Sequence, residues 1–320
     1  MPRLLNSLVF AACFAAALAN AVTSDKDPNT DPIGGFVPKK SLSLIAFIFY
    51  AVSGVTHFFH FFTVPPRSSF MIALPIGMTV MAIGFVLRIL YANPPYTLGK
   101  YIIMDLCILL SPCLFLATDY MLLSRLARSF DEEVSSRCLI IRDSRITKIF
   151  VWSDVLTFIL QSGGGSLSAS KNASSAKLGN KIALIGLILQ AVSFGLFTLV
   201  LIVFGQRVSK HYPELWRPKF PHPFKVLSKE PIHDWRILFY VMCVTCVGIL
   251  VRSIFRVAEY ADGYTGTIST HEGYFYLFDT VPLWISMSLY CVVWPVRALF
   301  NRSEQQLELG SRKNLNQPNF

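Results

Sequence analysis

The sequence VRSIFRVAEY, residues 251–260, ends a long apolar run and carries Arg252, Arg256 and Glu259. On an α-helix these positions are spaced i, i+4 and i+7, so they fall within one narrow stripe. The preceding residues, FYVMCVTCVGIL at 239–250, are almost entirely apolar. A water-soluble amphipathic helix would continue its polar stripe through that region. The charges must therefore be accommodated inside an apolar segment, and the solvent around that segment decides the fold.

The composition indicates that this solvent is lipid. The 320-residue chain is 53% hydrophobic, 13% aromatic and 15% charged, with a mean hydropathy of +0.50. A soluble domain carries about 25% charged residues, so this chain has the composition of an integral membrane protein. Its net charge of +10 comes from basic residues that lie between apolar runs. Because they do not form one patch, we predict that the chain does not bind nucleic acid.

The first segment, residues 1–21, is predicted to be a secretory signal peptide. Arg3 precedes a short apolar stretch at 4–18, and Ala19-Asn20-Ala21 follows as an A-x-A cleavage site. An uncleaved first helix is the alternative interpretation. Residues 22–40 are polar and rich in proline and glycine, which predicts a disordered tail.

Seven apolar runs follow, each close to the roughly 20 residues that cross the hydrocarbon of a bilayer. Only helices and closed barrels can span a membrane, and these runs lack the two-residue alternation of barrel strands. We therefore predict an all-α, polytopic bundle of seven transmembrane helices at 41–300, followed by a tail at 301–320. The predicted spans are 41–62, 70–90, 101–123, 146–165, 181–204, 237–258 and 275–300.

The loops predict the orientation. The segments 124–148 and 206–236 and the C-terminal tail are rich in lysine and arginine, whereas 259–274 contains neither. Because basic loops stay in the cytoplasm, the N-terminus is predicted outside and the C-terminus inside. The sequon at Asn172 then faces outward as a glycosylation candidate. The basic inner loops are predicted to contact anionic inner-leaflet lipid. The sequence does not define an oligomeric state.

Polar residues from five predicted spans share one depth near the outer ends of those spans. Charges within spans normally face the bundle interior or a wet cavity and pair with each other. Two interpretations stay open: the charges hold the helices together, or they line a polar cavity that opens to the outer leaflet and binds lipid headgroups. The set comprises Arg88, Asp105, Gln161, Arg252, Arg256, Glu259 and Asp279, with Asp154 deeper.

Four stretches carry a resemblance to a known family. They are SPCLFLATDYMLLSR (111–125), WSDVLTFILQSGGGSL (152–167), GLILQAVSFGLF (186–197) and RSIFRVAEYADGYTGTISTHEGYFYLFDTVPLW (252–284). Together they resemble the fungal lipid-translocating exporter family, seven-helix proteins linked to aminocholesterol and sphingoid-base resistance. Asp105 and Asp119 depart from the family pattern by adding charge to span three. The resemblance implies these site candidates: Asp154, Gln161, Gln190, Arg252, Arg256, Glu259, Glu272 and Asp279.

The resemblance implies that the protein translocates amphipathic lipids, namely sphingoid bases, sterol-like amines or phospholipids, across the plasma membrane. The vacuolar membrane is the alternative location. A seven-helix receptor or sensor for an amphipathic ligand is the alternative function. We do not predict an enzyme, because no catalytic triad is recognisable and His57 and His60 share a single span. No cofactor and no metal are expected.

Overall fold

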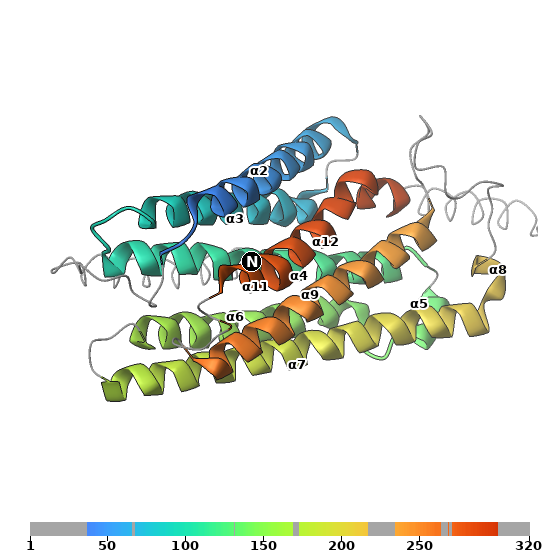
Figure 1. Cartoon of the computed structure of the whole chain (residues 1–320). Helices are drawn as coiled ribbons and strands as arrows, with labels where there is room; N and C mark the ends of the chain where they lie inside the picture. The colour runs from blue at the N-terminus through green and yellow to red at the C-terminus, as the bar shows by residue number, and fades with distance from the viewer. Residues whose placement is uncertain are drawn as a thin grey trace, which may run out of the picture.

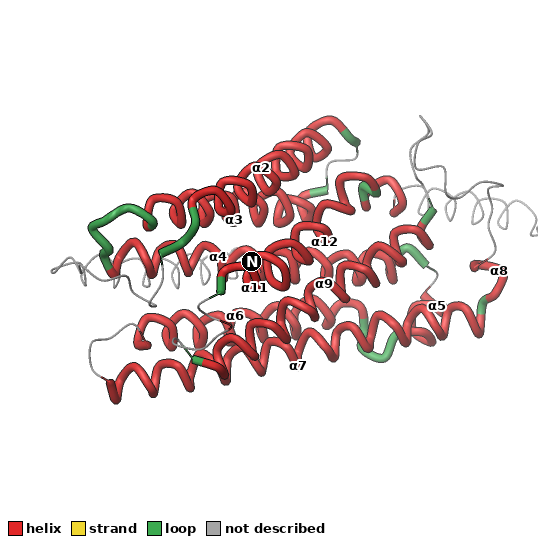
Figure 2. The backbone as a smooth tube through the Cα atoms, viewed as in Figure 1, coloured by secondary structure: helices red, strands yellow, loops and turns green. Residues whose placement is uncertain are grey.

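The computed structural model describes residues 37–65, 68–130, 132–168, 173–216, 234–263, 268 and 271–299. Within these residues the chain forms helices joined by short turns, without a strand (Figure 2). The predicted signal peptide, most of the 22–40 tail, Asn172 and the 301–320 tail lie outside the described residues. The described residues confirm the prediction of an all-helical fold.

The long helices run side by side in an elongated bundle (Figure 1). Helix α4 packs against α3 and α6, while α9 packs against α7 and α12. The helical elements are α2 (Lys40–Thr63), η1 (Ser69–Ile72), α3 (Ala73–Tyr91), α4 (Leu98–Arg128), α5 (Glu132–Cys138), α6 (Asp143–Ser168), α7 (Ala173–His211), α8 (Pro213–Trp216), α9 (Trp235–Asp262), α11 (Glu272–Phe275), η2 (Tyr276–Thr280) and α12 (Val281–Val292).

Six helical segments are long and apolar enough to cross a membrane. They are Lys40–Thr63, Ser69–Tyr91, Gly99–Arg128, Ser174–His211, Trp235–Asp262 and Glu272–Val292. Helix α6, predicted as the fourth span, has 26 residues but is less apolar, because it carries Asp154, Gln161 and a glycine triplet. The count of seven spans and the orientation of the termini therefore stay predictions.

The outer surface of the bundle is apolar and its interior holds charges, which suits a lipid solvent. Val55, Phe59 and Ile254 are 69%, 64% and 67% exposed, whereas Asp119 and Asp279 are completely buried. Apolar side chains pointing into hydrocarbon cost no hydration free energy, and charges that face the bundle interior avoid the lipid. The polypeptide therefore places its polar groups between helices.

The last predicted span, 275–300, differs from the structure. The helix begins at Glu272 and passes through a π-helical turn, η2, before it continues as α12. It ends at Val292, and the next helical residues begin at Pro295. Proline has no backbone N–H and disfavours helical geometry in the preceding residue, so it favours a break here. The π-helical turn contains Asp279, and π-turns often mark functional positions.

Two glycines bring α6 and α7 into backbone contact. A Cβ atom built on Gly164 would lie 2.5 Å from the Ala183 nitrogen, and one on Gly179 would lie 2.4 Å from the Ser168 nitrogen. Small residues permit such close helix packing in membranes. Gly164 is the middle residue of the glycine triplet at 163–165. The structure shows the close contact at Gly164.

This contact gives a first prediction with a matched control. We expect Gly164→Ala to lower the free energy of unfolding by about 1–3 kcal/mol, because the added methyl group overlaps the α7 backbone. Outside the backbone of its own helix, no described atom lies within 4 Å of a Cβ added to Gly163, so we expect Gly163→Ala to leave that free energy unchanged or raise it slightly. Unfolding of both purified variants in mixed micelles measures the difference. Equal effects would contradict the backbone contact.

Candidate functional site

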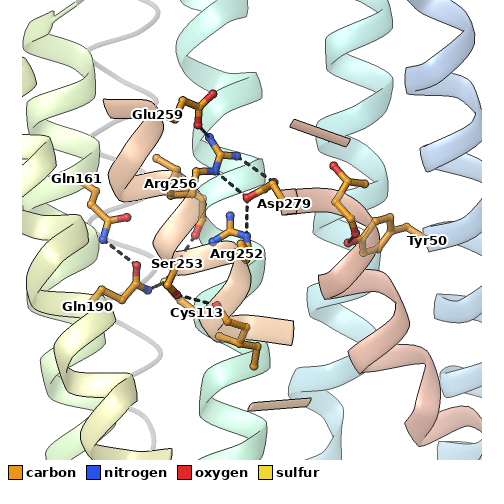
Figure 3. Close-up of polar contacts among 12 residues, drawn as sticks. Tyr50, Cys113, Gln161, Gln190, Arg252, Ser253, Arg256, Glu259 and Asp279 are labelled. Atoms are coloured by element: carbon orange, nitrogen blue, oxygen red, sulfur yellow. Dashed lines mark hydrogen bonds and ion pairs between the residues drawn. The ribbon is translucent and has the colours of Figure 1, made fainter. Parts of the chain in front are cut away.

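The stripe on α9 forms a buried ion-pair network with Asp279 (Figure 3). Arg252 Nε lies 2.9 Å from Asp279 Oδ1. Arg256 donates from Nε to Oδ1 at 2.8 Å and from Nη2 to Oδ2 at 3.2 Å. Asp279 is completely buried, and both arginines are about 5% exposed. One carboxylate from the π-helical turn thus holds two guanidinium groups from neighbouring turns of α9.

Glu259 and Arg252 lie at the two ends of this network along α9. Arg256 Nη1 donates to Glu259 Oε2 at 3.1 Å, within one turn of α9. Arg252 Nη2 is buried without a hydrogen-bond partner among the residues that the structure describes. The predicted i, i+4, i+7 stripe is therefore correct in its geometry, and Asp279 supplies the charge that the stripe faces.

A second ion pair adjoins the first through an aromatic ring. Arg88 of α3 donates from Nη2 to Glu272 Oε1 at 2.8 Å, and the backbone N–H of Lys39 donates to Glu272 Oε2 at 2.8 Å. The guanidinium carbons of Arg88 and Arg256 lie 4.6 and 5.1 Å from the centroid of Phe275. These contacts connect α3, the start of α2, α9 and α11. Depth alone did not place Glu272 in the set, which it joined through the family resemblance.

Asp105 of α4 faces the same cluster without a direct partner. It lies close enough to interact electrostatically with Arg88, Arg252, Arg256 and Asp279. The side chain is half-buried, and no described residue forms an ion pair or a hydrogen bond with it. A Cβ atom on Gly165 would lie 3.6 Å from its Oδ2 atom. Asp105 is therefore an acidic side chain beside the network. None of the guanidinium groups of Arg88, Arg252 and Arg256 forms an ion pair with it.

The two predicted glutamines form a pair of their own. Gln161 donates from Nε2 to Gln190 Oε1 at 2.9 Å, and Gln190 Nε2 lies 3.7 Å from Cys113 Sγ. Gln161 and Gln190 are 3% and 6% exposed. The pair links α6, α7 and α4 beside the ion-pair network (Figure 3). It supplies amide dipoles in the interior without adding net charge.

Asp154 lies apart from the other candidates. It is 1% exposed, and neither carboxyl oxygen has a hydrogen-bond partner among the described residues. The Tyr120 hydroxyl of α4 faces this carboxyl group and interacts with it, although neither group makes a hydrogen bond of normal geometry to a described residue. Asp154 and Gln161 are separated by seven residues on α6. They share a helix face, but their contacts show that they belong to different sites.

Sequence reasoning did not include the polar group around Asp119 as a site. Tyr290 donates to Asp119 Oδ1 at 2.6 Å, and Thr245 Oγ1 lies 3.4 Å from Asp119 Oδ2. The charge of Asp119 within span three was the available signal, but the hydroxyl partners on α9 and α12 could not be recognised without the packing. Asp119 is therefore satisfied by hydroxyl groups.

The histidines of the first span contact residues in and just after α12. Cys291 Sγ lies 3.4 Å from His57 Nε2, and the His60 ring stacks on Trp294 at 5.3 Å. Among the described residues no three His, Cys, Asp or Glu side chains are placed to hold a metal ion.

These features define a class: a multi-pass, all-helical membrane protein whose charged residues meet inside the bundle. Residues 74–302 match the family described as RTA1 like protein. The chain belongs to this family, and the resemblance predicted from the four stretches is confirmed. No solved structure matches the chain.

Relatives from Saccharomyces cerevisiae cover most of the chain. Protein RTA1 is 29% identical over 297 residues, which are 85% of this chain and 88% of the relative. Protoporphyrin uptake protein 1 is 32% identical over 65% of this chain and 62% of its own length. The sphingoid long-chain base transporter RSB1 of strain YJM789 is 22% identical over 84% of this chain and 75% of its own length.

Proposed function

We propose that the protein moves cationic amphipathic lipids, sphingoid bases above all, across the membrane in which it lies. The charge of one cluster carries this proposal. We call it the outer cluster, and it comprises Arg88, Asp105, Arg252, Arg256, Glu259, Glu272 and Asp279. Three guanidinium groups stand against four carboxylates, and Asp105 is the carboxylate without a contacting partner among the described residues. The cluster therefore retains one negative charge when all its members are ionised. A cationic headgroup would neutralise it, whereas an anionic headgroup would meet repulsion.

The relatives support lipid-like cargo but differ in the molecule and direction that their names give. One is named for a sphingoid long-chain base and another for protoporphyrin uptake. Both cargoes join a large apolar body to ionisable groups. We assign the cationic member of this class to the present chain because of the excess carboxylate. Its predicted location is the plasma membrane.

In this mechanism the headgroup enters between the helices while the alkyl tail stays in hydrocarbon. Asp279 and Glu259 hold the two arginines of α9 in fixed positions, so they are positioning residues. Asp105, which is half-buried and has no ion-pair or hydrogen-bond partner among the described residues, takes the ammonium group. Ammonium–carboxylate contacts are charge-assisted hydrogen bonds and are stronger than neutral ones.

The test uses purified protein in liposomes that contain a fluorescent sphingoid base, or separately a fluorescent zwitterionic phospholipid. A quencher added outside reports transbilayer exchange. We expect wild type to speed exchange of the sphingoid base above empty liposomes and above the phospholipid. Folded protein without exchange of either lipid would contradict transport and favour the receptor or sensor alternative, which ligand binding would then test.

Asp105→Asn gives a sharper prediction. A hydrogen bond to a charged group contributes about 1.5–3 kcal/mol, so we expect exchange of the sphingoid base to slow about tenfold or more. The unfolding midpoint should stay that of wild type, because no described residue forms an ion pair or a hydrogen bond with the side chain. Exchange of the zwitterionic phospholipid serves as the control and should change less. Unaltered sphingoid-base exchange would exclude Asp105 as the headgroup site.

We also propose that anionic lipid binds near the predicted cytoplasmic ends of α7 and α9. A groove of about 390 Å³ lies there between the two helices, with Lys210, Ser209 and Trp216 among its lining residues. A lysine beside an aromatic side chain suits a phosphate headgroup at the interface. Residues 217–233, which carry further basic charge, lie outside the described residues.

A further inference from the structure

We infer that Asp154 is a proton-binding site whose proton is exchanged for the cationic headgroup of a transported lipid. This inference rests on the proposed function and adds an energy source to it. The observation is a carboxyl group that is 1% exposed and has no hydrogen-bond partner for either oxygen in the described part of the chain. Asp154 is thus a buried acid without the arginine partners that Asp279 has.

The groups that face Asp154 do not neutralise a negative charge. Helix α6 packs mainly against α7 and α4, and the titratable groups that face Asp154 are the Tyr120 hydroxyl and the Cys113 thiol of α4. The Tyr120 ring is enclosed by Phe150 and Phe197, at centroid distances of 5.3 and 4.6 Å. An ionised carboxylate in such surroundings is very unfavourable. The site is stable when it carries a proton or when a cation is paired with it.

Asp119 is a useful contrast because it has the same burial and different partners. The carboxyl oxygens of Asp119 face Tyr290 of α12 and Thr245 of α9. The Cys246 thiol and Tyr120, which follows Asp119 in the sequence, lie within electrostatic range. Hydroxyl donors therefore satisfy Asp119 within the protein. The Tyr120 hydroxyl faces Asp154, but no described donor makes a hydrogen bond of normal geometry to either Asp154 oxygen, so these oxygens can take up a proton or an ammonium group.

Polar groups connect Asp154 to the outer cluster. The Cys113 thiol interacts electrostatically with both Asp154 and Arg252, and it also contacts the Gln190 amide. Gln190 in turn accepts from Gln161. An ammonium headgroup that leaves Asp105 thus meets amide dipoles before it reaches the buried carboxyl group. Tyr120 lies within electrostatic range of both Asp154 and Asp119.

Exchange at one carboxyl group couples the two movements. The Asp154 O–H bond breaks as the ammonium group arrives, and the carboxylate pairs with the cation. The proton leaves to water on the side of the membrane from which the lipid came. When the headgroup departs to the opposite side of the membrane, a proton from water on that opposite side re-forms the O–H bond. One positive charge replaces another, so the site stays neutral throughout. Lipid then moves in one direction as a proton moves in the other.

The experiment uses liposomes with a trapped pH dye and an added long-chain lipid that carries a quaternary ammonium headgroup, which cannot itself bind a proton. For wild type we expect the lumen to become alkaline as the lipid moves inward. Asp154→Asn, which resembles the protonated acid in shape, should lose at least nine-tenths of this pH change. Asp154→Glu should retain part of it. Asp119→Asn, a buried acid that is already satisfied, should behave as wild type.

Each outcome bears on the inference separately from the proposed function. Lipid movement by wild type without a pH change would overturn the exchange and leave transport standing, and so would an equal loss in Asp119→Asn and Asp154→Asn. If neither this lipid nor the sphingoid base moves, the proposed function fails. Infrared spectroscopy then decides the site, because a protonated Asp154 gives a carboxylic-acid C=O band in wild type that Asp154→Asn lacks. Identical spectra in this region would overturn the proton site.

Discussion

Replacing Asp279 with asparagine is expected to lower the free energy of unfolding by about 3–5 kcal/mol, the cost of leaving a buried charge without its partner. Asp279 is completely buried and contacts both Arg252 and Arg256. Asparagine keeps the size and one acceptor oxygen, but it brings an amide NH2 group against a guanidinium group. Two positive charges on neighbouring turns of α9 would then repel each other inside the bundle.

Unfolding in mixed micelles of increasing sodium dodecyl sulfate measures this change. Glu133→Gln is the matched control, because Glu133 forms an exposed pair with Arg137 at 3.5 Å, and surface pairs contribute about 0–1 kcal/mol. Glu259→Gln should fall between the two, since Glu259 pairs with Arg256 and is 17% exposed at its side chain. If Asp279→Asn and Glu133→Gln had equal effects, the network would not stabilise the fold.

The contrast between Asp279 and Asp154 extends to stability. Asp154→Asn removes an acid that has no ion-pair partner among the described residues, so we expect the free energy of unfolding to stay the same or to rise at a pH where the acid would otherwise ionise. The sign is thus opposite to that for Asp279→Asn, although both side chains are buried aspartates. A large loss of stability in Asp154→Asn would show that Asp154 holds the helices together.

The sequence predicted the helices well because apolar run length is a strong signal in a membrane protein. The first predicted span, 41–62, corresponds to α2, Lys40–Thr63. The first and last residues of a helix that continues beyond the hydrocarbon are harder to predict. Helix α7 is an example: the predicted span is 181–204, and the helix extends from Ala173 to His211. Polar residues at its ends can remain helical in water, and hydropathy does not report on them.

Part of the arrangement of the site was predicted from the sequence. The groupings that differ from the structure have a common cause. The helical stripe on α9 followed from periodicity alone, and the structure pairs Arg252 and Arg256 with Asp279 as that stripe requires. Depth grouped Arg88 with Asp105, Glu259 and Asp279, yet its ion-pair partner is Glu272. Depth does not identify which helices are neighbours. Glu272 also belonged to a predicted loop, because the start of the last helix is short of apolar residues.

A shared helix face also misled the grouping of Asp154 with Gln161. Seven residues return to nearly the same face but advance about 10 Å along the axis. The two side chains therefore meet different neighbours on α4 and α7: Gln161 contacts Gln190, and Asp154 faces Tyr120. Periodicity gives the direction of a side chain, and a site also requires the packing distance between helices.

The Arg88–Glu272 pair should show strong coupling when both members are changed together. We expect Arg88→Met and Glu272→Gln each to lower the free energy of unfolding by about 3–5 kcal/mol, since each leaves one buried charge. Both side chains are 7% exposed and joined at 2.8 Å. The double variant should recover most of this loss, because methionine packs on Phe275 and glutamine still accepts from the Lys39 N–H.

The double-mutant cycle measures that recovery in the same micelle assay. An interaction energy of about 2 kcal/mol or more between the two positions would show direct coupling. Independent, additive losses would contradict the ion pair. The pair connects α3 to the start of the last membrane helix, so its coupling also decides whether α11 is anchored to the bundle before the π-helical turn presents Asp279 to α9. If it is, the single variants should weaken sphingoid-base exchange together with stability, and the double variant should restore both.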